Sequence, residues 1–254
     1  TALLGLTTDL GGSTLIAANI STTNSAIVFN DPVTLTGNAI LSSGTGAITF
    51  NDIVNGARSL TLNSTGISTF NNVVGGVVPL LSLATNAGGT SVFGASCTSV
   101  TTSAVGGISI GDAVTFNGPL TTLNTSTGNG PVVLTGAVTL NGDLTASSGS
   151  GLITFSNTLN GARNVILNSS GVTTFTGIVG GTVPLLSLTT DAGGSTSIGA
   201  NISTTNGNII FNDAVNLAAN TVINSGTGAV TFGSTLDGAP TSTVNSAGVT
   251  SFTG

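Results

Sequence analysis

Apolar and polar residues alternate over short stretches of this chain, and many of the stretches end on phenylalanine. The sequence reads Ile-Thr-Phe at residues 48–50 and 153–155, and Val-Thr-Phe at residues 114–116 and 230–232. Adjacent residues of a β-strand point to opposite faces. The apolar residue and the phenylalanine of each stretch are therefore predicted to point inward and the threonine outward. The pattern predicts many short, half-buried strands.

The phenylalanines recur with a short period. They stand at Phe29, Phe50, Phe70, Phe93, Phe116, Phe155, Phe175, Phe211, Phe232 and Phe252. A coil of about 20 residues is too short for a strand–helix unit, but it accommodates three short strands around a triangular core. Stacked coils bury their apolar rows only against neighbouring coils. We therefore expect an all-β fold, a right-handed parallel β-helix (β-solenoid) of roughly 12 coils and about 60 Å in length.

A longer repeat lies over this short period. The string NGARSLTLNSTGISTFNNVVGG at residues 55–76 shares 13 of its 22 positions with residues 160–181. Residues 6–14 return at residues 188–196, an offset of 182. The middle copy carries 28 extra residues, which we interpret as about one added coil plus a few loop residues. A single solenoid of three related modules is predicted, at residues 1–78, 79–183 and 184–254.

An array of β-sandwiches is the main alternative fold. Sandwich hairpins need unequal strands and two-residue turns, whereas here one apolar–Thr–Phe row recurs, so the solenoid is favoured. Both ends of the sequence fall inside a repeat, since Ala2-Leu3-Leu4 stands where later copies read Pro-Leu-Leu. We expect the sequence to be a window of a longer repeat protein.

Composition agrees with short strands and tight turns, and it excludes several functions. The chain contains two Arg and eight Asp but no Lys, Glu, His, Tyr, Trp or Met. Charged residues make up 4% of it, against about 25% in ordinary soluble domains. A net charge of −6 argues against nucleic-acid binding, which needs a basic stripe. No apolar run is long enough to insert across a membrane.

Cys97 and the two arginines are the residues that first suggest chemistry. Cys97 is the sole cysteine, and it has no histidine to act as its base. Its register aligns it with Ile20 and Ile202, so we predict an inward, small hydrophobic role. Arg58 and Arg163 occupy matching places in two NGAR strings, and we interpret them as solvated turn residues, because the third copy has proline there.

The aspartates do not form a recognisable catalytic or metal-binding set. Calcium takes six to eight oxygen ligands, usually with converging carboxylates, and the aspartates here are scattered over turns, where Asx-turn hydrogen bonds account for them. Some β-solenoids cleave polysaccharides, but they need a base with paired carboxylates or a metal. We predict no enzyme activity, no cofactor and no metal.

The outward threonines are the candidate contact surface. Flat threonine rows on a solenoid can order water or ice, or hydrogen-bond glycans. The simpler interpretation is that an uncharged solenoid needs polar, β-favouring residues outside. The residues predicted to stack as one ladder are Thr49, Thr69, Thr115, Thr154, Thr174 and Thr231.

The strings FNDAV, SGTGAVTF and VGGTVPLLSLTTDAGGS carry a family resemblance. They resemble the β-strand repeats of large Gram-negative exoproteins of the filamentous-haemagglutinin type, over essentially the whole chain. The resemblance implies a right-handed β-helix in a secreted or surface-anchored fibre, which serves as stalk, adhesin or matrix filament.

We therefore expect a non-enzymatic structural segment of a secreted or bacterial cell-surface fibre. The alternative is a binding module whose threonine ladder contacts ice or glycan. The expected partners are further copies of the chain or flanking coils, together with a glycan or a host or abiotic surface. Nucleic acid and membrane insertion are not expected. The scarcity of charge also predicts that the segment self-associates.

Overall fold

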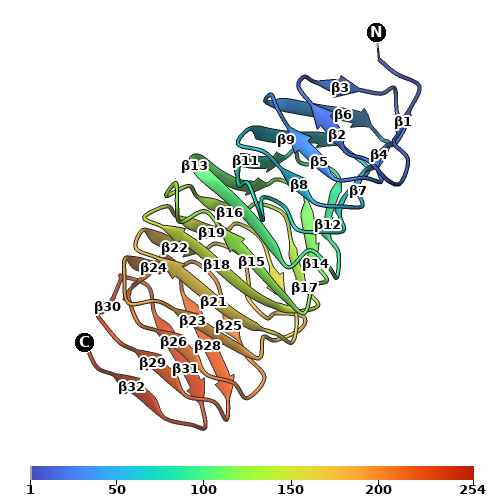
Figure 1. Ribbon diagram of the computed structural model, residues 1–254. Helices are drawn as coiled ribbons and strands as arrows, with labels where there is room; N and C mark the ends of the chain where they lie inside the picture. The colour runs from blue at the N-terminus through green and yellow to red at the C-terminus, as the bar shows by residue number, and fades with distance from the viewer. Residues whose placement is uncertain (1) are drawn as a thin grey trace.

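The chain forms an elongated parallel β-solenoid in the computed structural model, which describes residues 2–254 (Figure 1). About 12 coils of about 21 residues stack along one axis, and the two termini lie at opposite ends of the rod (Figure 1). Neighbouring coils pair through parallel strands, and residues 2–254 contain no helix. The predicted all-β solenoid is confirmed.

Each coil contributes short strands to three faces, which we call faces 1, 2 and 3 in chain order. The strands of face 1 are β1 (Leu6–Thr7), β4 (Ile27–Phe29), β7 (Ile48–Phe50), β10 (Ile67–Phe70), β12 (Thr90–Phe93), β14 (Ala113–Phe116), β17 (Val138–Leu140), β20 (Leu159–Asn160), β25 (Ile202–Ser203), β28 (Thr221–Gly226) and β31 (Ser242–Ser246). Val179 bridges β20 to β25 and makes this face continuous.

Face 2 follows face 1 within each coil. Its strands are β2 (Thr14–Ile16), β5 (Val33–Leu35), β8 (Val54–Asn55), β15 (Leu120–Asn124), β18 (Asp143–Gly149), β21 (Asn164–Ser169), β23 (Ser187–Thr190), β26 (Ile209–Phe211), β29 (Val230–Phe232) and β32 (Thr250–Phe252). The longest strand, β13 (Ser99–Ile110), belongs to two faces. It pairs with β15 at its start and with the neighbouring strands of face 3 at its end.

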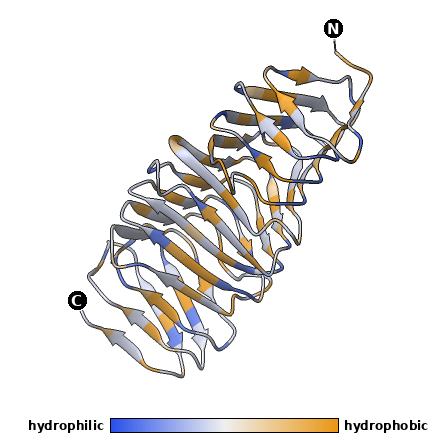
Figure 2. Cartoon of the chain, in the orientation of Figure 1, coloured by the Kyte–Doolittle hydropathy of each residue, from blue (hydrophilic) through white to orange (hydrophobic). Residues whose placement is uncertain are grey.

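Face 3 completes the coil. Its other strands are β3 (Ile20–Ser21), β6 (Ala39–Gly44), β9 (Ser59–Ser64), β11 (Leu80–Thr85), β16 (Val132–Leu134), β19 (Ile153–Phe155), β22 (Val172–Phe175), β24 (Ser195–Ile198), β27 (Ala214–Leu217) and β30 (Leu236–Asp237). Hydrophobic residues recur along the strands of every coil (Figure 2). The inward residues of the strands form one core that runs the length of the rod.

Stacked phenylalanine rings occupy that core. On face 1, Phe29, Phe50, Phe70, Phe93 and Phe116 stack with ring centroids 5.0 to 5.3 Å apart. Phe155 and Phe175 stack on face 3, and Phe211, Phe232 and Phe252 on face 2. Nine of the ten rings are fully buried, as the alternation predicts. Phe252, in the last strand of the chain, is 59% exposed.

The three sequence modules are rotated about the rod axis. Phe50, Phe155 and Phe232 hold equivalent places in the repeat, but they lie on faces 1, 3 and 2. On face 1, the residue that stacks eight coils beyond Ile27 is Ile202. The residue that matches Ile27 in the sequence repeat is Ile209, which lies seven residues later, on face 2. The offset of 182 residues therefore moves each feature to the next face.

Candidate functional site

The predicted outward threonines do not form one ladder. The structure places Thr49, Thr69 and Thr115 on face 1, Thr154 and Thr174 on face 3, and Thr231 on face 2. All six are half-buried, because neighbouring rungs cover their flanks. The prediction of a single row is wrong because equivalent strands of successive modules rotate from face to face.

Each face instead has its own outward row, and the row of face 1 is continuous over eight coils. Its members are Thr7, Val28, Thr49, Thr69, Val92, Thr115, Thr139 and Asn160. Seven of the eight are β-branched, which suits a pleated strand surface, and none carries a charge. Val28 was not predicted to belong to the row, although it stands in Ile-Val-Phe at the place of the threonine in Ile-Thr-Phe. The result is an uncharged, weakly polar surface.

Asparagine side chains join successive coils at the corner after the face 1 phenylalanines. The Asn51 amide donates from Nδ2 to Asn30 Oδ1 at 2.6 Å, and Asn71 donates to Asn51 Oδ1 at 2.8 Å. Further along the same corner, Asn141 donates to Asn117 Oδ1 at 2.8 Å. These amides satisfy one another between coils, so they serve the stacking of the rod.

Each module buries one aspartate at a corner. The Asp31 carboxylate accepts hydrogen bonds from the hydroxyls of Thr8 (2.7 Å) and Thr14 (2.8 Å) in the preceding coil. Asp213 accepts the same bonds from Thr190 (2.7 Å) and Thr196 (2.9 Å). In the middle module Asp112 accepts from Ser91 Oγ at 3.1 Å and from the Gly89 amide at 2.9 Å.

These three carboxylates correct the expectation of Asx turns. Asp31, Asp112 and Asp213 are at most 5% exposed, and they bind hydroxyls or amides of a neighbouring coil rather than their own turn. Asp52 Oδ1 accepts the amide of the next residue, Ile53, and also the side-chain amide of Asn72 in the following coil, so it forms no Asx turn either. A sequence signal for this contact was missed: Thr8, Thr14 and Asp31 recur 182 residues later, with the same spacing, as Thr190, Thr196 and Asp213.

Two of the buried carboxylates differ in acidity although their partners match. The Thr8 hydroxyl, with help from Thr14, holds the pKa of Asp31 below its usual range. Burial raises the pKa of Asp213, and this outweighs the hydrogen bonds from Thr190 and Thr196. Asp213 is 2% exposed against 5% for Asp31, and the nearby charge of Asp191 raises its pKa further.

Cys97 lies in the core, as its register predicts. Its side chain is fully buried, and burial raises the pKa of the thiol to about 12. A thiol with that pKa remains protonated and is a poor nucleophile. Within residues 2–254, no three side chains of His, Cys, Asp or Glu come together to hold a metal ion.

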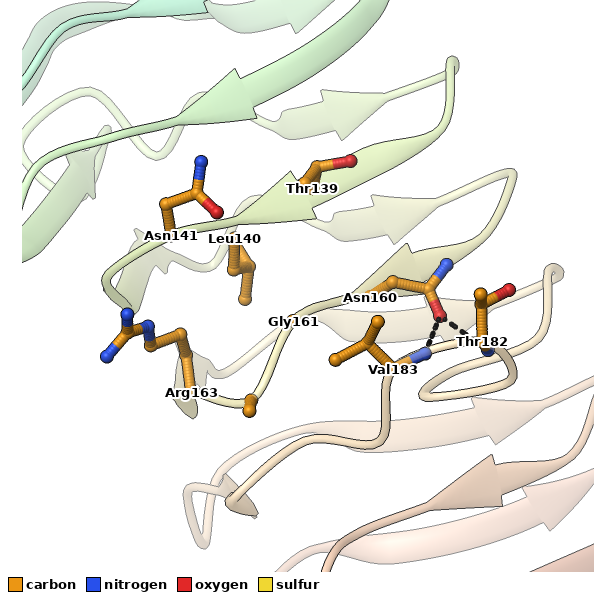
Figure 3. Close-up of a pocket in the computed structure, with 9 residues that line it drawn as sticks. Thr139, Leu140, Asn141, Asn160, Gly161, Arg163, Thr182 and Val183 are labelled. Carbon is orange, nitrogen blue, oxygen red and sulfur yellow. Dashed lines mark hydrogen bonds between the residues drawn. The ribbon is translucent and has the colours of Figure 1, made fainter.

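The two NGAR strings form corners beneath outward loops. On face 1, Val179 and Leu185 pair with Ile202 and Thr204, so residues 180–184 bulge out of the stack. Residues 75–79 bulge in the same way in the first module. In the middle module, the bulge and the corner below it enclose a hollow of about 460 Å³ (Figure 3).

Asn160 fixes the wall of this hollow. Its Oδ1 accepts the backbone amides of Thr182 at 3.0 Å and Val183 at 3.3 Å (Figure 3). The residues that line the hollow are Thr139, Leu140, Asn141, Asn160, Gly161, Ala162, Arg163, Thr182 and Val183.

Comparison of the chain with protein-family models, with curated proteins and with solved structures finds no match. A search of residues 2–254 for a helix long and apolar enough to cross a membrane also finds none. The site is therefore interpreted from its own geometry.

Proposed function

We propose that this chain is a non-enzymatic structural segment of a secreted or bacterial cell-surface fibre. The observation that carries the proposal is the continuous rod itself. Its inward phenylalanines stack from coil to coil, and the asparagines and buried aspartates at its corners bind the neighbouring coil. A stack of this kind extends by repetition, because each coil presents the next with the same contacts.

The resemblance to exoproteins of the filamentous-haemagglutinin type supports the extracellular part of the proposal. It predicts that flanking coils of the same chain or further copies continue the rod, as stalk, adhesin or matrix filament.

Two measurements test the proposal. Immuno-electron microscopy of intact source cells should place the protein outside the cell on filamentous material, whereas label confined to the cytoplasm would contradict the localisation. Light scattering of the purified chain over a range of concentrations should show growth by whole rods of about 60 Å. A monodisperse monomer at high concentration would remove self-association from the proposal.

The outward row of face 1 favours a second candidate function, contact with ice or a glycan. The row from Thr7 to Asn160 is in register and uncharged over eight coils. An ice-recrystallisation assay and a glycan array test it directly. The double variant Thr115→Tyr/Thr139→Tyr interrupts two adjacent rungs of this row, and Thr154→Tyr/Thr174→Tyr interrupts face 3 as the matched control. Loss of activity in the first variant alone would support this role, and no activity in the native chain would exclude it.

A further inference from the structure

The corner beside Arg163 combines a hollow with a cation that has no hydrogen-bonding partner among residues 2–254. The volume of the hollow, about 460 Å³, lies within the range of small-molecule sites. Arg58 and Arg163 are the only two basic residues of the chain, and both stand at NGAR corners. The corner adjoins the end of the face 1 row, but binding of a small molecule there does not require the fibre role.

The two arginines differ in what they bind. Arg58 donates from Nε to the Thr36 carbonyl oxygen at 2.9 Å and from a terminal nitrogen to the Ala57 carbonyl oxygen at 2.8 Å. No hydrogen bond of the Arg163 guanidinium to any group of residues 2–254 is found, and it takes part in none of those drawn in Figure 3. Arg58 is therefore tied to the corner, and Arg163 is available to a ligand.

The hollow is formed before any ligand arrives. The Asn160 side chain holds both amides of the bulge. Gly161 (φ +137°) and Gly180 (φ +68°) adopt backbone conformations that residues with a side chain rarely adopt. A preorganised wall of this kind removes part of the ordering cost of binding.

The lining groups define the chemistry of the ligand. A guanidinium pairs with a carboxylate through two parallel hydrogen bonds. The hydroxyls of Thr139 and Thr182 suit a hydroxylated ligand, and the side chain of Val183, which is 44% exposed, suits the apolar face of a ring. We propose that the Arg163 corner binds a sugar that bears one carboxylate, of the uronic acid class.

The surrounding charge limits the ligand to one negative group. Asp143 precedes this corner by one coil, and its two carboxylate oxygens accept from the backbone and side-chain nitrogens of Asn164 at 2.9 and 3.0 Å. Asp143 is thus engaged elsewhere, but its charge and the net charge of −6 oppose a polyanion. The variant Asp143→Asn should strengthen binding of the carboxylate.

Nuclear magnetic resonance titration of the ¹⁵N-labelled chain at low salt tests the proposal. Glucuronate should shift the amide signals of Gly161, Thr182 and Val183 in a saturable manner, and glucose should bind at least tenfold more weakly. The variant Arg163→Gln should lower glucuronate affinity at least tenfold, because it removes a charge-assisted pair. The matched variant Arg58→Gln should leave the affinity unchanged.

Four results would overturn the assignment. They are the absence of a saturable shift with glucuronate, equal binding of glucose, unchanged binding in Arg163→Gln, and equal loss in Arg58→Gln. Equal binding of acetate would overturn the sugar assignment, since it would show an anion contact alone. Arg163 is exposed, so its variant should keep the native fold, and circular dichroism checks that directly.

Discussion

The first and last modules have nearly the same local structure on different faces of the rod. In the first, Thr8 and Thr14 bind Asp31, and Phe29 stacks on Phe50 on face 1. In the last, the residues 182 positions later make the same contacts, and the rings stack on face 2. The repeated sequence therefore encodes contacts between successive coils, and the same contacts form on whichever face the repeat occupies.

The two modules differ where the shared contacts end. Only the first has the asparagine ladder, the hydrogen-bonded row of Asn30, Asn51 and Asn71. In the last module Gly233 stands at the place of Asn51. The two buried aspartates also have pKa shifts of opposite sign. Burial of Asp213 and the nearby charge of Asp191 account for that second difference.

The largest expected effect is on the buried rings. Phe50→Ala and Phe232→Ala should each lower the free energy of unfolding of their coils by about 3–5 kcal/mol, since each leaves a cavity in a closed stack. Hydrogen exchange of the flanking strands measures this coil by coil. Phe252→Ala is the control and should cost less than half as much, because its ring is 59% exposed. A loss at Phe50 several times that at Phe232 would contradict the equivalence of the faces.

The next effect concerns the asparagine ladder. Asn51→Ala should cost about 1 kcal/mol, because it removes two hydrogen bonds between coils at a solvated corner. In the last module, Gly233→Asn should add a rung against Asn212, and it should be more stable than Gly233→Ala by a similar amount. Chemical denaturation of the four proteins checks both changes. Equal stability of the two Gly233 variants would show that the ladder contributes nothing.

The smallest effect is a pH dependence of opposite sign at the two ends. A lowered pKa means that Asp31 stabilises the fold above its unfolded value of about 3.8, and this contribution is lost as pH falls below that value. A raised pKa means that the folded protein holds the Asp213 proton more tightly than the unfolded chain does. The stability that this proton contributes is fully present below about 3.8, and it is lost as pH rises through the folded pKa of Asp213. Hydrogen exchange between pH 3 and pH 6 should show opposite slopes for the two corners. Parallel slopes would contradict the assignment.

The strands and the core were predictable from sequence because both depend on local alternation. Ile48, Thr49 and Phe50 show the in–out–in order that their pattern predicts. The rotation of the modules was not predictable, because small errors in coil length accumulate. A coil of about 20 residues fits into the offset of 182 about nine times and returns to the same face. The observed steps between paired residues of neighbouring coils vary from 19 to 26 residues, so the same offset ends one face further on.

The buried aspartates and the Arg163 hollow could not be predicted from the sequence for a related reason. Whether Asp31 is exposed depends on which hydroxyls of the preceding coil face it. Arg58 binds the backbone carbonyl of Thr36 one coil away, and Arg163 makes no such bond to Asn141, which holds the matching place. Contacts of this kind require the coil length to be known to a single residue.

Disulfide trapping tests the rotation of the modules most directly. In a Cys97→Ala background, Thr115→Cys/Thr139→Cys places two thiols on paired residues of face 1, where adjacent strands lie about 4.8 Å apart, within disulfide reach. Thr115→Cys/Val133→Cys joins two residues that a single ladder would place on adjacent strands, because Val133 pairs with Thr154, but Thr115 and Val133 lie on faces 1 and 3. Mild oxidation and mass spectrometry should show a cross-link in the first variant and none in the second. A cross-link in the second variant, with none in the first, would contradict the rotation.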